Sequence, residues 1–145
     1  MSKSDTFESD MLKLIFNAVG IANIADNAAS APLTFLYLSL HTADPGEAGN
    51  QSTNEAAYTG YARIAVARTA AGWVLSGTSP TQVALATNQD FGADTAGTGT
   101  ITFFGVGVAA SGTTKLLYSG TVTPNIVLNV GVTPRLTSGT VITED

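Results

Sequence analysis

Apolar residues recur at helical spacing only near the N-terminus of this chain. Within residues 4–26 they lie three or four positions apart and form one stripe, made of Met11, Leu14, Ile15 and Ala18. Asp5 or Ser9 can act as the N-cap, and the pattern predicts a helix that ends near Ala22 or Asn23. The apolar stripe must be covered, either by the chain's own sheet or by another subunit, and the first arrangement is the more common.

From residue 33 onward the pattern changes to short runs of β-branched and aromatic residues separated by turn residues. The predicted strands cover residues 33–41, 61–68, 73–75, 81–86, 99–109, 114–122, 125–130 and 136–142. They follow one another without intervening helices, a pattern typical of antiparallel sandwiches. The sequence therefore predicts a single, mostly β domain over residues 1–145, with an N-terminal helical segment (1–26) and an antiparallel β-sandwich or jelly roll (33–145).

Charged residues are scarce for a folded domain. They make up 12% of the 145 residues, against about 25% in an ordinary soluble domain, while 44% are apolar. Uncharged polar residues or neighbouring subunits must then cover much of the surface, which favours an assembly and a homo-oligomer. The net charge is −5 with scattered basic residues, and no apolar run reaches about 18 residues. We expect no direct contact with nucleic acid or with a membrane.

Candidate chemistry is sparse. His41 is the only histidine and cysteine is absent, so multi-histidine and cysteine-ligated metal sites are excluded, and no Gly-x-Ser-x-Gly elbow is present. Gly105 and Gly107 lie in a predicted strand without a following helix, which favours a bulge or a close backbone approach over a dinucleotide site. The loop acids lack the alternating pattern of an EF-hand calcium loop: Asp44, Glu47, Glu55, Asp90 and Asp94. We expect no catalytic residue, cofactor or metal.

The long polar segment of residues 42–58 is a candidate docking loop. Loops of this length in a compact domain usually have a functional reason. Asp44, Glu47 and Glu55 could pair with basic groups on a partner. A solvated loop with a rigid turn at Pro45 and Gly46 is the alternative, and the sequence leaves both open.

Residues 38–68 carry a distinctive string. They contain Leu-Ser-Leu-His-Thr-Ala-Asp-Pro-Gly-Glu-Ala-Gly at 38–49, Asn-Glu-Ala-Ala-Tyr at 54–58 and Thr-Gly-Tyr-Ala-Arg-Ile-Ala-Val-Ala-Arg at 59–68. This string resembles a family of small virion structural proteins of tailed bacteriophages. Its members are described either as tail-fibre-like proteins or as capsid cement (head decoration) proteins. The resemblance implies a structural, non-enzymatic role.

Size separates the two locations. A tail fibre usually needs length, repeats or a stalk, whereas this chain offers one compact domain. The preferred hypothesis is therefore a capsid cement protein, made in the host cytoplasm, that binds the outside of the major capsid protein shell and stabilises it. The alternative is a tail-associated receptor- or carbohydrate-binding module that uses Trp73 and nearby loop aromatics for stacking. The predicted partner contacts are Asp44, Glu47 and Glu55 in the loop and Met11, Leu14, Ile15 and Ala18 on the helix.

Overall fold

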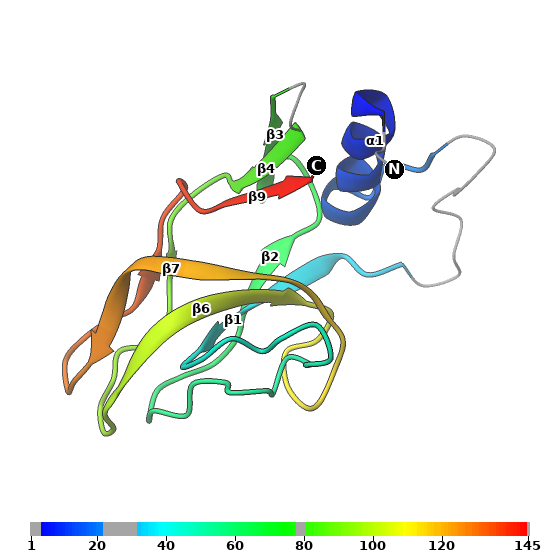
Figure 1. The fold of residues 1–145 in the computed structure, drawn as a ribbon. Coiled ribbons are helices and arrows are strands. Elements are labelled where there is room, and N and C mark those ends of the chain that lie inside the picture. Colours follow the sequence, from blue (N-terminus) through cyan, green and yellow to red (C-terminus); the bar gives the residue numbers. More distant parts are fainter. Residues whose placement is uncertain (1–3, 22–31, 78–80, 145) are drawn as a thin grey trace. The chain divides into compact units, whose positions relative to one another are not determined.

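A computed structural model describes residues 4–21, 32–77 and 81–144 (Figure 1). The chain divides into two compact units, each assembled from separated segments. Unit 1 consists of Met1–Phe35, Val66–Asn88 and Thr137–Asp145, and unit 2 consists of Leu36–Ala65 and Gln89–Leu136. The single domain expected from the sequence stays a prediction.

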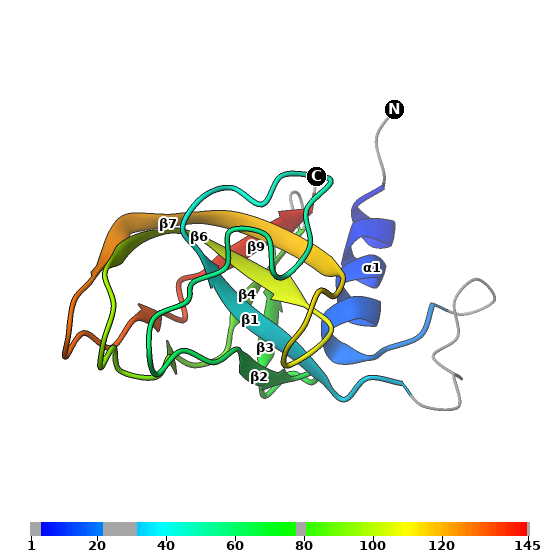
Figure 2. The same cartoon turned by 90° about the horizontal axis from the view of Figure 1, so that it is seen from below.

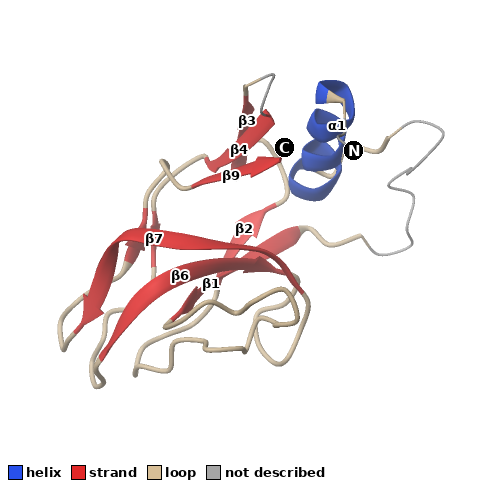
Figure 3. Ribbon diagram, viewed as in Figure 1, coloured by secondary structure: helices blue, strands red, loops and turns tan. Residues whose placement is uncertain are grey.

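Strands make up most of the regular structure, and the described residues contain one helix (Figure 3). In chain order the elements are α1 (Asp5–Asn17), β1 (Phe35–His41), β2 (Ile64–Ala67), β3 (Trp73–Ser76), β4 (Thr81–Leu85), β5 (Gln89–Asp90), β6 (Gly99–Gly107), β7 (Leu116–Leu128), β8 (Arg135–Leu136) and β9 (Val141–Glu144). They form sheets in the orders β2-β1-β6-β7, β3-β4-β9 and β5-β8. The mostly β, antiparallel class with one N-terminal helix is confirmed, while the sandwich or jelly-roll arrangement stays a prediction.

Helix α1 begins and ends earlier than the sequence pattern predicts. Ser4, not Asp5 or Ser9, is the N-cap, and its hydroxyl accepts a hydrogen bond from the Phe7 N–H. Ala18 adopts a left-handed conformation (φ 55°), which ends the helix at Asn17. The predicted end at residues 22–23 lies outside the described residues. Within those residues, no helix has the length and apolar character needed to cross a membrane.

The buried face of α1 lies beside the predicted stripe. Leu12 and Phe16 are fully buried, whereas Met11, Leu14, Ile15 and Ala18 are half-buried. The helix contacts β3 and β4 of the same unit, and the Phe16 ring packs 4.7 Å from the Trp73 ring, between centroids. The expectation that the chain's own sheet covers the helix is therefore confirmed, with a different pair of residues at the centre of the contact.

Arg68 closes the C-terminal end of α1. The last turn of the helix contains no basic residue of its own. The Arg68 guanidinium, which follows β2, donates to the carbonyl oxygens of Leu14 and Ile15, both at 2.6 Å, and to that of Leu33 at 2.7 Å. A cation at this end complements the helix dipole and satisfies carbonyls that lack intrahelical partners.

Three strand predictions needed correction. Residues 114–122 and 125–130 form one strand, β7, which continues through Pro124 because an edge strand tolerates the missing N–H. Opposite Pro124 the register shifts: Ile101 faces Ile126 but Phe103 faces Thr121, so β7 bulges between these pairs. The segment 136–142 divides at its Ser-Gly turn into β8 and β9, which join different sheets. The two-residue strand β5 was not predicted.

Candidate functional site: the loop layer of unit 2

Two glycines of β6 leave space for other side chains on one face of the central strands of unit 2. In the β1–β6 register, Ser39 faces Gly105 and Tyr37 faces Gly107. A Cβ on Gly107 would lie 1.9 Å from the Gln51 Cδ, and one on Gly105 would lie 2.7 Å from the His41 Nε2. The register also shifts at Gly107, so the expected bulge is present. The close approach is made by side chains, however, and not by a neighbouring backbone.

Gln51 fills the space above Gly107 and connects two loops. Its Oε1 accepts hydrogen bonds from the N–H groups of Val108 (3.0 Å) and Ala109 (3.2 Å) and from the Thr114 hydroxyl (2.6 Å). Its backbone N–H donates to the Thr114 carbonyl at 2.9 Å. The loop after β1 and the loop after β6 lie side by side in both views (Figures 1 and 2). Gln51 is fully buried and holds them together.

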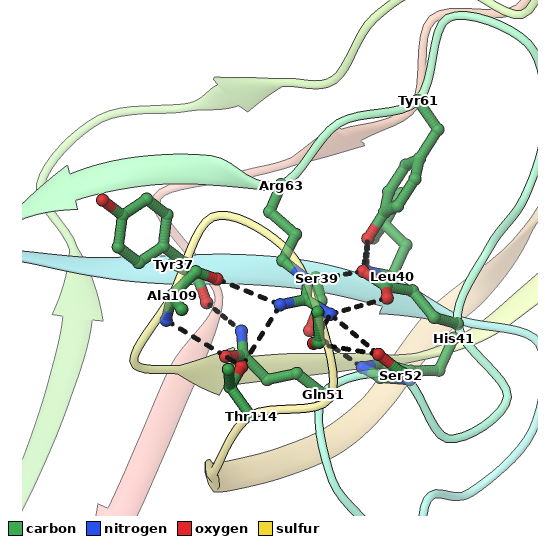
Figure 4. A network of polar contacts seen from close by, with 12 residues as sticks. Tyr37, Ser39, Leu40, His41, Gln51, Ser52, Tyr61, Arg63, Ala109 and Thr114 are labelled. Carbon is green, nitrogen blue, oxygen red and sulfur yellow. Dashed lines mark hydrogen bonds and ion pairs between the residues drawn. The ribbon is translucent and has the colours of Figure 1, made fainter.

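Arg63 forms the second connection. Its guanidinium makes a bidentate pair with Glu55, with Nε–Oε1 and Nη2–Oε2 both at 2.7 Å. Figure 4 shows Arg63 with two of its other partners, Ser52 and Ala109. It also donates to the carbonyl oxygens of Ala109 and Gly112, both at 3.0 Å. The hydrogen bonds to Glu55 raise the pKa of Arg63. The Arg63 side chain is 2% exposed, so the ion pair is shielded from solvent.

Tyr61 ties the ion pair to β1. Its hydroxyl donates to the Glu55 Oε1 at 2.8 Å and accepts from the Leu40 N–H at 3.1 Å. Burial of the phenol, reinforced by the charge of Glu55, raises the pKa of Tyr61 far above its usual range. The carboxylate of Glu55 therefore serves two side chains of its own unit.

His41 and Ser39 form a hydrogen-bonded pair beneath the loop. The His41 Nδ1 lies 2.8 Å from the Thr53 carbonyl, so Nδ1 carries the proton, and Nε2 accepts from the Ser39 hydroxyl at 2.8 Å. Burial lowers the pKa of His41, although the Thr53 hydrogen bond and the Glu55 charge oppose this. Both side chains are fully buried, so no substrate reaches the pair and its role is structural.

We define the polar cluster as the six side chains that fix the two loops: Ser39, His41, Gln51, Glu55, Arg63 and Thr114. Two open grooves lie along the loops that the cluster fixes. The first has a volume of about 450 Å³ and is lined by Asp44, Gly46, Glu47 and Gly49 of the loop and by residues 116–119 of β7. The second, of about 330 Å³, is lined by Glu55, Ala56, Tyr61, Ala62, Arg63 and residues 110–112. Both grooves have one wall made by a loop that the cluster immobilises.

The predicted contact residues fall into three groups. Asp44 and Glu47 are exposed and line the first groove together. Glu55 is engaged with Arg63 and Tyr61, so it cannot offer a free carboxylate to a partner. The helix stripe belongs to unit 1, whereas the loop acids belong to unit 2.

Trp73 does not form a stacking surface, because it is 1% exposed and packs against Phe16 in unit 1. Sequence reasoning also missed Gln51 and Arg63 as the residues that fix the loops. The nearest signal in the sequence was the pair Gly105 and Gly107 in β6. Glycines in a strand indicate that another group approaches closely, but they do not indicate which side chain it is.

The fold and the cluster define a small β-rich structural module with locked surface loops. Residues 3–144 match the model of a protein family described as podophage GP4 fiber I protein gp80. The match covers nearly the whole chain, so the chain belongs to this family of bacteriophage fibre proteins. A comparison with curated proteins finds no match.

Family membership confirms the part of the sequence-based hypothesis that both alternatives share, a non-enzymatic structural protein of a bacteriophage virion. It favours the tail-associated alternative over the capsid cement hypothesis, because the family is described by a fibre. The length argument misled the prediction of location, because a short chain can also be one component of a fibre.

Proposed function

We propose that this chain is a tail-fibre component that contacts a protein partner through the loop layer of unit 2. The observation that carries the fibre assignment is the family match over residues 3–144. The family match gives no support to the capsid cement hypothesis or to the major capsid protein as a partner. Self-association into a homo-oligomer is part of the proposal, since low surface charge is typical of surfaces buried between subunits.

The first groove supports a protein partner with basic side chains. Asp44 and Glu47 present two carboxylates on one wall, opposite the half-buried Leu116, Leu117 and Tyr118. The Asp44 Oδ1 accepts from the Gly46 N–H at 2.8 Å, which fixes the turn that carries both acids. A loop ordered before binding loses less conformational entropy when a partner arrives. Acidic groups on such a loop select basic partners and speed their encounter.

Carbohydrate binding has less support than protein binding. The aromatic residues expected to stack on sugars pack inside the units: Trp73, Tyr58 and Phe91 are each at most 6% exposed. Tyr58 and Tyr61 lie edge to face at 5.5 Å between ring centroids, and Tyr61 and Phe91 stack at 6.0 Å. These contacts occupy the faces that a sugar ring would need.

The fibre assignment is tested on virions that lack the protein. Adsorption to host cells and DNA retention after heating or osmotic shock are measured separately. A fibre component predicts poor adsorption with normal DNA retention. Normal adsorption with increased DNA release would overturn the assignment and restore the cement hypothesis.

The groove is tested with the double variant Asp44→Asn, Glu47→Gln. Its adsorption, measured over a range of salt concentrations, should be slower than that of the wild type and less sensitive to salt. Asp10→Asn, which removes a half-buried acid of α1 in unit 1, is the control and should behave like the wild type. If both variants adsorb normally at every salt concentration, the groove is not the contact, although the fibre assignment stands.

A further inference from the structure

Strand β7 is the longer of the two edge strands of its sheet. It lies outside β6 in the order β2-β1-β6-β7, and among the described residues no strand pairs with its outer edge (Figures 1 and 2). An edge strand presents a row of backbone N–H and C=O groups to which a further strand can be added. The opposite edge strand, β2, has only four residues, and a short edge discourages such pairing.

β7 lacks the charged side chains that usually protect a long edge, since none of its 13 residues is charged. Pro124 and the bulge between Thr121 and Ile126 interrupt its second half, because a proline has no N–H and a bulge bends the strand. Residues 118–121 precede this interruption and pair with β6 without a shift in register. A further strand can therefore follow the part of the edge that precedes Pro124.

The first groove runs along this part of the edge. It touches four consecutive residues of β7, 116–119. Successive side chains of a strand point to opposite faces, so a groove that touches all four lies at the edge and not on one face of the sheet. The other wall is formed by residues 44–49 of the loop after β1. An extended segment in the groove would have the β7 backbone on one side and this loop on the other.

The loop wall carries negative charge. Asp44 and Glu47 are the only charged residues that line the groove, and neither forms an ion pair among the described residues. The Asn54 side chain donates to the Asp44 carbonyl at 3.0 Å, and the Gly49 N–H donates to the Gly46 carbonyl at 3.0 Å, so the wall is held in place before a partner arrives. Basic side chains complement this wall, whereas a second copy of the chain, with its net charge of −5, would bring further negative charge.

We propose that the partner binds as an extended segment with basic side chains, which adds to the outer edge of β7 as a fifth strand of the sheet. This inference rests on the proposed use of the first groove and names the kind of segment that enters it. Main-chain hydrogen bonds to β7 supply the affinity. Every second side chain of the added strand faces the same side, so Asp44 and Glu47 select basic residues at alternate positions.

A short blocked peptide of alternating lysine and valine is the probe, and it is titrated against the full chain by NMR. The peptide should bind, and it should slow amide hydrogen exchange in residues 116–121 of β7 several-fold while exchange in β2 stays unchanged. The control peptide has the same sequence with every backbone nitrogen methylated. It keeps the charges but cannot donate main-chain hydrogen bonds, so it should not bind.

The double variant Asp44→Asn, Glu47→Gln tests the loop wall. It should weaken binding of the lysine–valine peptide roughly three- to tenfold at low salt and by less at high salt, because two exposed charge pairs are lost. Asp10→Asn, in unit 1, should bind the peptide like the wild type. Unchanged affinity in the double variant would overturn the selection of basic residues by the loop.

Equal binding of the two peptides, or exchange in β7 that the lysine–valine peptide does not slow, would overturn strand addition. Exchange in β7 that slows when the protein alone is concentrated would show that a second copy occupies the edge, and it would also overturn the proposal. The adsorption of the double variant tests the groove separately, and virions that lack the protein test the fibre assignment. A failure of strand addition alone therefore leaves both of these standing.

Discussion

Within each of the two units, a different kind of contact stabilises the structure. In unit 1 the centre of the structure is apolar, with Leu12 and Phe16 of α1 against Trp73 of β3. In unit 2 the loops are held by buried polar groups, above all Gln51 and Arg63, whose hydrogen bonds end on backbone atoms as well as side chains. The free energy gained from apolar packing increases with the buried apolar area, whereas that of a hydrogen bond depends on its distance and angle.

The difference appears again in the polar atoms that remain unpaired. Unit 1 buries the Asn17 Oδ1, the Trp73 Nε1 and the Thr81 Oγ1 without a hydrogen-bond partner among the described residues. The polar cluster of unit 2 leaves no such atom, and in that unit only Asp94 does. We therefore expect the free energy of unfolding to fall when a member of the polar cluster is removed, and to rise when an unpaired polar atom of unit 1 is removed.

Loss of Arg63 should have the largest effect. Arg63→Met keeps much of the side-chain length but leaves the Glu55 charge and two loop carbonyls without their partner, so the free energy of unfolding should fall by about 3–5 kcal/mol. Urea denaturation measures the change. Arg135→Met is the matched control, because its pair with Asp90 is exposed, and its stability should equal that of the wild type within error. Equal losses in the two variants would contradict the special role of the cluster.

Gly107→Ala should have the next largest effect. Its Cβ would lie 1.9 Å from the Gln51 Cδ, so the side chain that connects the loops must move. Overpacking of this kind costs about 1–3 kcal/mol of unfolding free energy. In the control, Gly139→Ala, the nearest atom to the new Cβ is the Thr137 Oγ1 at 3.5 Å, and stability should hardly change. A Gly107→Ala protein as stable as the control would show that Gln51 is free to shift.

The units also differ in how far their sequences predict them. Local patterns predict the elements of unit 1, because helical spacing and strand alternation indicate which side chains face a core. Even in unit 1, the predicted apolar stripe of α1 lies beside the face that is actually buried, which contains Leu12 and Phe16. Both faces carry apolar residues at helical spacing, so the periodicity alone does not distinguish them. The cap at Arg68 could not be predicted from local spacing, because the residue lies more than fifty positions from the two helix carbonyls that it binds, those of Leu14 and Ile15.

The polar cluster of unit 2 could not be predicted from spacing. Gln51 and Thr114 meet over sixty residues apart, and no periodicity connects them. The string that carried the phage resemblance nevertheless contains His41, Glu55 and Arg63, all of them buried or paired inside the unit. The string therefore contains residues that fix the loop layer, and it indicated a family of phage virion proteins. Partner contact by Glu55 stays a prediction, since the structure shows its carboxylate bonded to Arg63 and Tyr61.

Acid should weaken unit 2 through its only histidine. Burial lowers the pKa of His41 in the folded protein below the value of about 6.5 in the unfolded chain, so the unfolded chain binds the proton more readily. Stability is therefore complete above pH 6.5 and falls as the pH decreases below it. Urea denaturation between pH 7.5 and 5 measures this, with His41→Gln as the variant that lacks the slope. Stability that rises toward pH 5 would contradict the neutral, buried histidine.

The smallest expected effects set the two units against each other directly, through the same substitution in each. Thr81→Val in unit 1 removes a buried hydroxyl without a partner, so the free energy of unfolding should rise by about 1 kcal/mol. Thr114→Val in unit 2 removes a hydroxyl that donates to the Gln51 Oε1, so it should fall by about 1 kcal/mol. Because the change in shape and volume is the same, urea denaturation of the two variants compares only the hydrogen bonding of the two hydroxyls. Changes of the same sign would mean that the two units tolerate polar substitution alike.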